Sequence, residues 1–143
     1  MSAQDNLQIV RIFYEAFNAH DLDRDDDLVT EDYRSEGPGA SEPMTRAQVR
    51  QQNQAYLTAF PDIHFDIART IAQGDYVVAH WIATGTHTGP LPTPSGGAIP
   101  PTGKSARLMG CAIYEFREGR VARAWNHWDM AALLAQLGVM PAM

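Results

Sequence analysis

The densest group of polar residues lies near the end of the sequence, where Asn126-His127-Trp128-Asp129 closes a run of β-forming residues. Successive side chains of a strand point to opposite faces, so Asn126 and His127 cannot both line one cavity. If Asn126 faces inward, Trp128 shares its face and His127 points outward. An inward amide could hold a carbonyl or enolate oxygen, but it cannot transfer protons near neutral pH. The alternative for Asn126 is a buried amide that satisfies backbone groups.

Three other residues are candidates for proton transfer. His87 ends a predicted strand on the same face as Trp81 and Gly85, directly before a segment rich in proline and glycine. It is either an imidazole at the mouth of a pocket or a histidine hydrogen-bonded to the backbone of that segment. Asp129 precedes the last predicted helix, where an N-cap role is favoured over a catalytic one. Glu36, on a short predicted strand, is a weaker acid/base candidate.

Aromatic residues could form the wall of an apolar binding site, although aromatic residues at core spacing are usually core. The residues expected to contact a substrate are Tyr14, Phe17, Tyr33, Trp81, Tyr114 and Trp128, together with Glu36 and Ala112. The histidines lack the close spacing of a metal site, and no phosphate-binding or nucleophile motif occurs, so we expect no metal and no cofactor. Cys111 lies in a β run without basic neighbours and is expected to pack.

The periodicity of apolar residues predicts the elements that position these side chains. Helices are expected over residues 6–19, 21–29, 45–60 and 130–137, and strands over 33–36, 63–67, 76–87, 105–116 and 121–128. Residues 88–104 should project from the strand ends as a stiff flap. Helices followed by consecutive antiparallel strands indicate an α+β fold, with a cone-shaped, curved sheet wrapped over the N-terminal helices and a short C-terminal helix. We expect one domain spanning residues 1–143.

Composition narrows the class of partner. The net charge of −6 argues against nucleic acid or an anionic membrane, because both require a basic surface. One cysteine permits no intrachain disulfide. Neither a signal-peptide pattern nor an apolar run long enough to span a membrane is found, so we expect a cytoplasmic protein that binds a hydrophobic small molecule.

Several short motifs occur in an order that resembles the SnoaL-like polyketide cyclase (ester cyclase) family. They are Ala16-Phe17-Asn18, Ala59-Phe60-Pro61-Asp62, Gly85-Thr86-His87-Thr88-Gly89, Pro100-Pro101-Thr102-Gly103-Lys104, Glu118-Gly119-Arg120-Val121, Trp125 with Asp129, and Leu137-Gly138. The resemblance implies the cone-shaped α+β barrel shared with ketosteroid isomerase and nuclear transport factor two. It also implies cofactor-free acid/base chemistry, in which an aspartate abstracts an α-proton and the carbanion closes a ring by aldol addition.

The resemblance places two different residues at the family's polar positions. The acid/base aspartate of the last strand falls on Asn126, and the assisting polar residue of the preceding strand falls on Ala112, whereas His87 matches a family histidine. Two interpretations follow. In the first, the protein is a cyclase, lyase or isomerase in which His87, Asp129 or Glu36 transfers the proton and Asn126 steadies the oxyanion. In the second, it binds a small molecule without chemistry.

The outer face of the predicted sheet is apolar. Met109, Cys111 and Ile113 share one face of their strand, and Trp125 and His127 fall on the same side of the next strand. A face of this kind is seldom left in contact with water. We therefore expect a homodimer or higher oligomer formed through the outer sheet.

Overall fold

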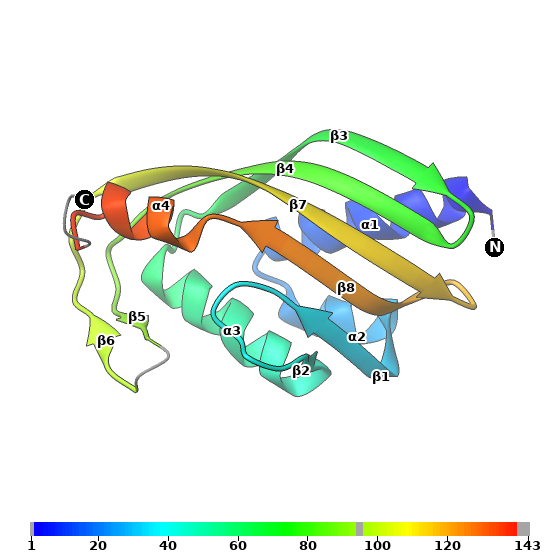
Figure 1. Ribbon diagram of the computed structural model, residues 1–143, viewed down its shortest axis with the longest axis horizontal. Coiled ribbons are helices and arrows are strands. Elements are labelled where there is room, and N and C mark those ends of the chain that lie inside the picture. The colour runs from blue at the N-terminus through cyan, green and yellow to red at the C-terminus, as the bar shows by residue number, and fades with distance from the viewer. Residues whose placement is uncertain (1, 94–95, 140–143) are drawn as a thin grey trace.

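The computed structural model describes residues 2–93 and 96–139 and has an α+β architecture (Figure 1). A six-stranded sheet with the order β2-β1-β8-β7-β4-β3 curves over the helices. The helices are α1 (Ala3–Asn18), the 3-10 helix η1 (Leu22–Arg24), α2 (Asp25–Leu28), α3 (Arg46–Ala59) and α4 (Met130–Gln136). The strands are β1 (Val29–Glu36), β2 (Met44–Thr45), β3 (His64–Gln73), β4 (Tyr76–Thr86), β5 (Leu91–Pro92), β6 (Ala98–Ile99), β7 (Ser105–Arg117) and β8 (Arg120–Trp128). The predicted fold class is confirmed.

Local sequence signals fix the ends of the helices. Thr45 caps α3, because its hydroxyl accepts from the Gln48 N–H and the Gln48 side chain accepts from the Thr45 N–H. Asp129 caps α4, since its carboxylate accepts from the Ala132 N–H at 3.0 Å. Ser2 begins α1 with a second capping box, which starts the helix earlier than residue 6. None of the helices in the described ranges is long and apolar enough to span a membrane.

The sheet contains two pairings that the sequence did not predict. Strands β3, β4, β7 and β8 pair antiparallel in sequence order, as expected. β1, however, lies parallel to β8, with Ser35 opposite Ala124, and β2 pairs with β1. β1 is also longer than the predicted strand over 33–36. Parallel pairing joins segments distant in the chain, so no local turn signal announces it.

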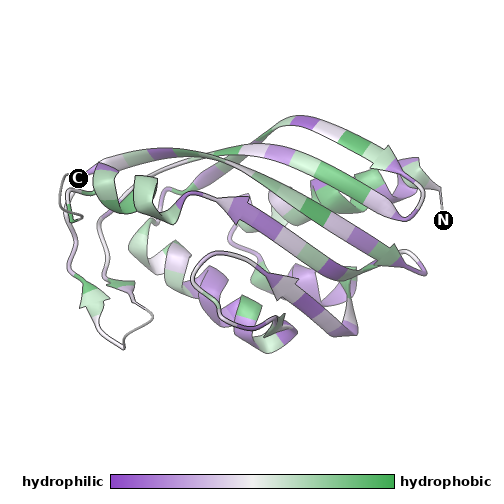
Figure 2. Cartoon of the chain, viewed as in Figure 1, coloured by the Kyte–Doolittle hydropathy of each residue, from purple (hydrophilic) through white to green (hydrophobic). Residues whose placement is uncertain are grey.

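The tight β7–β8 turn has positive φ at both central residues, +53° at Glu118 and +80° at Gly119, as hairpin turns require. This turn and a register shift between Glu115 and Phe116 together place Ala112 opposite Asn126 and Ile113 opposite Trp125. Along β7, buried positions alternate with more exposed ones, and apolar residues lie on both faces of the strand (Figure 2).

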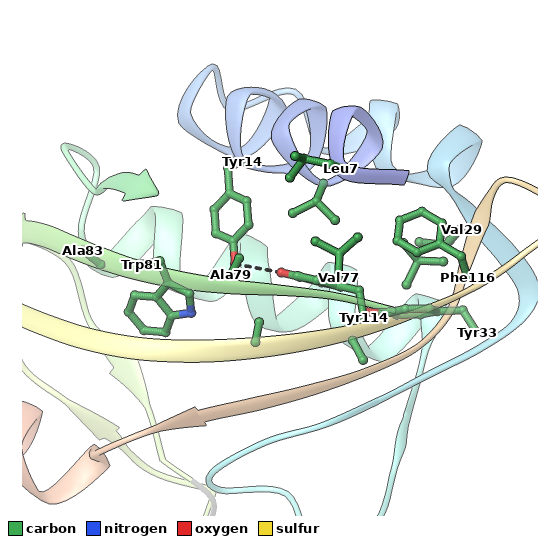
Figure 3. Close-up of a cluster of buried hydrophobic side chains, with 14 residues drawn as sticks. Leu7, Tyr14, Val29, Tyr33, Val77, Ala79, Trp81, Ala83, Tyr114 and Phe116 are labelled. Atoms are coloured by element: carbon green, nitrogen blue, oxygen red, sulfur yellow. Dashed lines mark hydrogen bonds between the residues drawn. The ribbon is translucent and has the colours of Figure 1, made fainter. Parts of the chain in front are cut away.

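The main core lies between the concave sheet face and α1 (Figure 3). It includes Leu7, Val10 and Tyr14 from α1, Val77, Ala79, Trp81 and Ala83 from β4, and Ala112, Tyr114 and Phe116 from β7. Gly110 leaves the space that the Trp81 indole fills, because a Cβ at this position would lie 2.1 Å from Trp81 Cζ2.

The segment 88–104 projects from the ends of β4 and β7, as expected, and contains the short β5–β6 pair (Figure 1). Its base is fixed against α3. Leu91 is buried with Ala59 and Phe60, and the Gly89 N–H donates to the Ala59 carbonyl at 3.1 Å. Residues 94 and 95 of the predicted flap lie outside the described residues.

Candidate functional site

A cavity of about 200 Å³ lies between the concave face of the sheet and helices α1 and α3. Its apolar and aromatic lining includes Phe13, Tyr14, Phe17, Met44, Val49, Tyr56, Phe60, Phe65, Trp81, Leu108, Tyr114, Trp128 and Leu133. Its polar lining includes Asp25, Tyr33, Ser35, Glu36, Gln52, Asn53, Thr84 and Asn126. An apolar enclosure with a few polar groups is the usual form of a small-molecule site.

One wall consists of aromatic rings in edge-to-face contact. The Phe65 ring centroid lies 5.0 Å from that of Trp81 and 5.2 Å from that of Phe17, with interplanar angles of 65° and 88°. Trp128 meets Tyr56 of α3 in the same manner, at 6.2 Å and 76°. Such contacts hold the rings in fixed positions, which favours a flat, hydrophobic ligand.

Two buried phenols form a pair inside the core. The hydroxyl oxygens of Tyr14 and Tyr114 lie 2.8 Å apart (Figure 3). Burial raises the pKa of both phenols well above the ordinary value of 10.0, so both stay protonated at neutral pH. One hydroxyl donates to the other, and the accepting phenol keeps its own proton. The pair can therefore offer one hydrogen bond to an oxygen in the cavity.

Tyr33 of β1 adds a further phenol to the lining. Burial raises its pKa to about 12, although the Ser35 hydroxyl acts in the opposite direction. Like the Tyr14–Tyr114 pair, Tyr33 is a hydrogen-bond donor at neutral pH and does not act as a base.

Asn126 lies on β8 and lines the cavity, as does Trp128 two residues later. His127 between them is exposed, so the predicted division of the two faces is confirmed. Within the part of the chain that the structure describes, the Asn126 side chain makes no hydrogen bond to protein. Its amide is available to a ligand.

Asp25, at the start of α2, is a carboxyl group in the cavity lining that the sequence analysis did not select. Burial raises its pKa from 3.8 to about 7, and the charge of Asp26 acts in the same direction. In the sequence it stands within a short acidic helix and is not distinguished from its neighbours. A signal was present, because Asp25 lies three residues from both Leu22 and Leu28, which is the spacing of one helix face, and both leucines are buried.

The sequence profile of the SnoaL-like polyketide cyclase family matches residues 7–137. The chain belongs to the SnoaL-like polyketide cyclase family. The resemblance recognised from the short motifs is thereby confirmed. No protein with a curated description matches the sequence.

Solved structures of the same fold include other SnoaL-like proteins. IdmH, a candidate polyketide cyclase from Streptomyces antibioticus, is 27% identical with a TM-score of 0.80, over 94% of this chain and 99% of that one. AclR, a candidate hydroxylase from Streptomyces galilaeus, is 23% identical with a TM-score of 0.85. The match covers 98% of this chain and 100% of AclR. A candidate SnoaL-like polyketide cyclase from Jannaschia sp. CCS1 is 18% identical with a TM-score of 0.84. The match covers 96% of this chain and 94% of that one. Such similarity at low identity shows a shared fold.

Among the residues selected from the sequence, the SnoaL-like fold brings most to the cavity. Those in its lining are Tyr14, Phe17, Tyr33, Glu36, Trp81, Tyr114, Asn126 and Trp128. The carboxylate of Glu36, however, is paired with Arg123 at 3.3 Å, and Arg123 lies over the Trp125 ring on the outer face. Glu36 is thus held by a cation outside the cavity.

The other selected residues lie elsewhere. His87 is completely buried, and its Nδ1 accepts from the Thr102 backbone N–H at 3.2 Å. His87 is thus hydrogen-bonded to the flap backbone, the alternative considered for it, and does not lie at a pocket mouth. Its ring is tilted against that of Phe60, with the centroids 5.3 Å apart. Asp129 is exposed and occupied as a helix cap. Ala112, fully buried in the core, also lies outside the lining.

The described ranges contain no group of three or more His, Cys, Asp and Glu side chains placed to hold a metal ion. The protein groups available for chemistry in the cavity are the Asp25 carboxyl group, four phenols, two hydroxyls and amides. These suit hydrogen bonding to a carbonyl oxygen and transfer of a proton at a neighbouring carbon.

Proposed function

We propose that the protein binds a hydrophobic, oxygenated small molecule in this cavity and catalyses cofactor-free proton transfer, of the aldol-cyclase or isomerase type. The observation that carries the proposal is the presence of the Tyr14–Tyr114 pair and the free Asn126 amide in an aromatic cavity. Preorganised donors stabilise a developing oxyanion most strongly where water is excluded. The 27% identity to IdmH supports a ligand of the polyketide class.

The proposal can be tested with 2-acetylnaphthalene, a flat aryl ketone whose methyl protons exchange slowly in neutral water. Binding is followed by tryptophan fluorescence, because Trp81 and Trp128 line the cavity. Exchange of the methyl protons is followed in D₂O by mass spectrometry. We expect saturable binding and exchange faster than in buffer. Absence of saturable binding would refute the proposal.

Asn126 provides a matched pair of variants. Asn126→Leu keeps a similar volume but removes the amide, and we expect it to weaken binding of the ketone about tenfold, the effect of one lost hydrogen bond. His127→Gln changes the neighbouring residue on the opposite, exposed face and should leave binding unchanged. Equal loss in both variants would show that the effect is not specific to the cavity.

A second candidate function is binding without chemistry. The observation that favours it is that Asn126, which occupies the position of the expected acid/base aspartate, cannot titrate. The same experiment separates the two functions. Saturable binding with exchange at the buffer rate would support the binding protein, whereas faster exchange would support the enzyme.

We also propose that the protein forms a homodimer through the outer face of the sheet. Met109 on this face is 57% exposed, and Ile113 and Trp125 lie opposite each other in the β7–β8 register. Light scattering at micromolar concentration should show a dimer, and Met109→Lys should shift it to monomer because an ammonium group would be buried. Glu42→Lys, at an exposed loop position, serves as control. A monomeric wild type would contradict this proposal.

A further inference from the structure

Asp25 differs from the other acidic residues in its segment. Its Oδ1 atom is buried and has no hydrogen-bond partner in the described part of the chain. Asp23, Asp26 and Asp27 are exposed. Buried polar atoms of side chains usually have a partner, and an oxygen left without one requires an explanation.

The nearby cations are engaged by other carboxylates. Arg50 of α3 pairs with Asp23, and its second nitrogen lies 3.4 Å from Asp26. Arg46 lies 3.8 Å from Asp26. Arg50 therefore acts on Asp25 through its charge, without a direct ion pair to the buried oxygen.

The groups that act on Asp25 come from several elements. Asp21 and Asp26 of its own segment disfavour the carboxylate, and Arg50 of α3 favours it. From the sheet, Tyr33 of β1 and Tyr114 of β7 lie within the electrostatic influence of Asp25. These are phenols of the cavity lining, so Asp25 shares its surroundings with the proposed oxyanion donors.

We propose that Asp25 is the acid/base residue of the cavity, removing a proton from the carbon next to a ligand carbonyl and returning it later in the reaction. This inference rests on the proposed function. It assigns proton transfer to a residue on the helical side of the cavity, in place of a residue on the last strand.

The step balances without a further reactant. The α C–H bond breaks, its proton joins an Asp25 carboxylate oxygen, and its electron pair forms the enolate. The negative charge on the carbonyl oxygen is stabilised by donors such as the Asn126 amide and the phenol pair. In an aldol closure the enolate carbon bonds to a second carbonyl carbon, and the new alkoxide takes the proton back from Asp25. In an isomerisation the proton returns to another carbon.

The pH behaviour of Asp25 agrees with this role. A base that titrates near the working pH combines a useful fraction of carboxylate with sufficient basicity. With the pKa of Asp25 raised to about 7 by burial, the rate of exchange should rise with pH and level off above about 7.

The decisive comparison is Asp25→Asn with Asp27→Asn, which removes the same charge at an exposed position of the same helix. With 2-acetylnaphthalene in D₂O, Asp25→Asn should lower the catalysed exchange rate about a hundredfold or more, the usual contribution of a positioned acid/base group. Its binding of the ketone, measured by fluorescence, should stay within about threefold, since the ligand oxygen is held by other groups. Asp27→Asn should match the wild type in rate, binding and pH profile.

The outcomes separate this inference from the proposed function. Exchange by Asp25→Asn at the wild-type rate would overturn the role of Asp25 and leave the proposed function intact. No binding by the wild type would overturn the proposed function. Binding by the wild type without exchange would overturn the role of Asp25 and favour the binding protein. Asp25→Leu, with an apolar side chain of similar size, is the second variant if Asp25→Asn does not fold, and it must also lose the exchange.

Discussion

The stability of the protein should depend on pH through Asp25. Its pKa is raised from 3.8 to about 7 in the folded protein, chiefly by burial, so the folded state holds this proton more tightly than the unfolded state does. The stabilisation of the folded state by the protonated Asp25 carboxyl group is fully present below about pH 4. It is lost as the pH rises to about 7. At about 1.4 kcal/mol for each pH unit, the contribution of Asp25 to the free energy of unfolding should fall by about 4 kcal/mol across that range.

Urea unfolding of wild type and Asp25→Asn, followed by tryptophan fluorescence, measures this effect directly. The amide that replaces the carboxyl group in the variant cannot ionise, so the stability difference between the two proteins should grow in favour of the variant by about 3 kcal/mol from about pH 5 to about pH 8.5. The dependence of unfolding on urea concentration should be unchanged, because the fold is the same.

Asp27→Asn is the control for this experiment, since it removes a carboxylate that is exposed. Its stability difference from the wild type should stay nearly constant over the same range. A constant difference for Asp25→Asn as well would refute the electrostatic account of Asp25, whatever its role in proton transfer.

Two further predictions concern the wall of the cavity. Gly110→Ala should destabilise the protein by about 1–3 kcal/mol and weaken ketone binding, because the added Cβ would collide with the Trp81 indole. Gly97→Ala is the control, since the nearest atom to its added Cβ lies 3.6 Å away, and it should change stability by less than about 0.5 kcal/mol. Urea unfolding of both variants checks this, and equal stability would contradict it. Tyr114→Phe should cost about 1–3 kcal/mol, since it leaves the Tyr14 hydroxyl buried without its partner. The double variant Tyr14→Phe/Tyr114→Phe should lose less stability than the two single variants lose together. Losses that simply add would argue against an energetic coupling between the two hydroxyls.

The parts of the fold that could be predicted are those with a local signal. Asp129 was recognised as a helix cap because the capping residue and its partner lie close in sequence. The inward position of Asn126 and Trp128 followed from strict alternation along a strand.

The remaining features depend on contacts distant in the chain. The parallel pairing of β1 with β8 joins segments about ninety residues apart, and no turn type marks it. Asp25 was missed because a run of aspartates resembles a solvated surface, and only the packing of η1 and α2 beneath the sheet buries one of them. His87 shared a face with Trp81, but β4 ends at Thr86, and the flap backbone then covers the imidazole.

The phenol pair also has a consequence for how the cavity is assembled. Tyr14 and Tyr114 are 100 residues apart in the chain, and their hydrogen bond joins the first helix to the penultimate strand. The cavity therefore cannot form from either half of the chain, and its completion waits for the most distant contacts, which form slowly. A ligand bound between α1 and β7 should tie these two segments together. Amide hydrogen exchange in α1 should then slow when the ketone binds, although the ligand touches only a few residues of that helix.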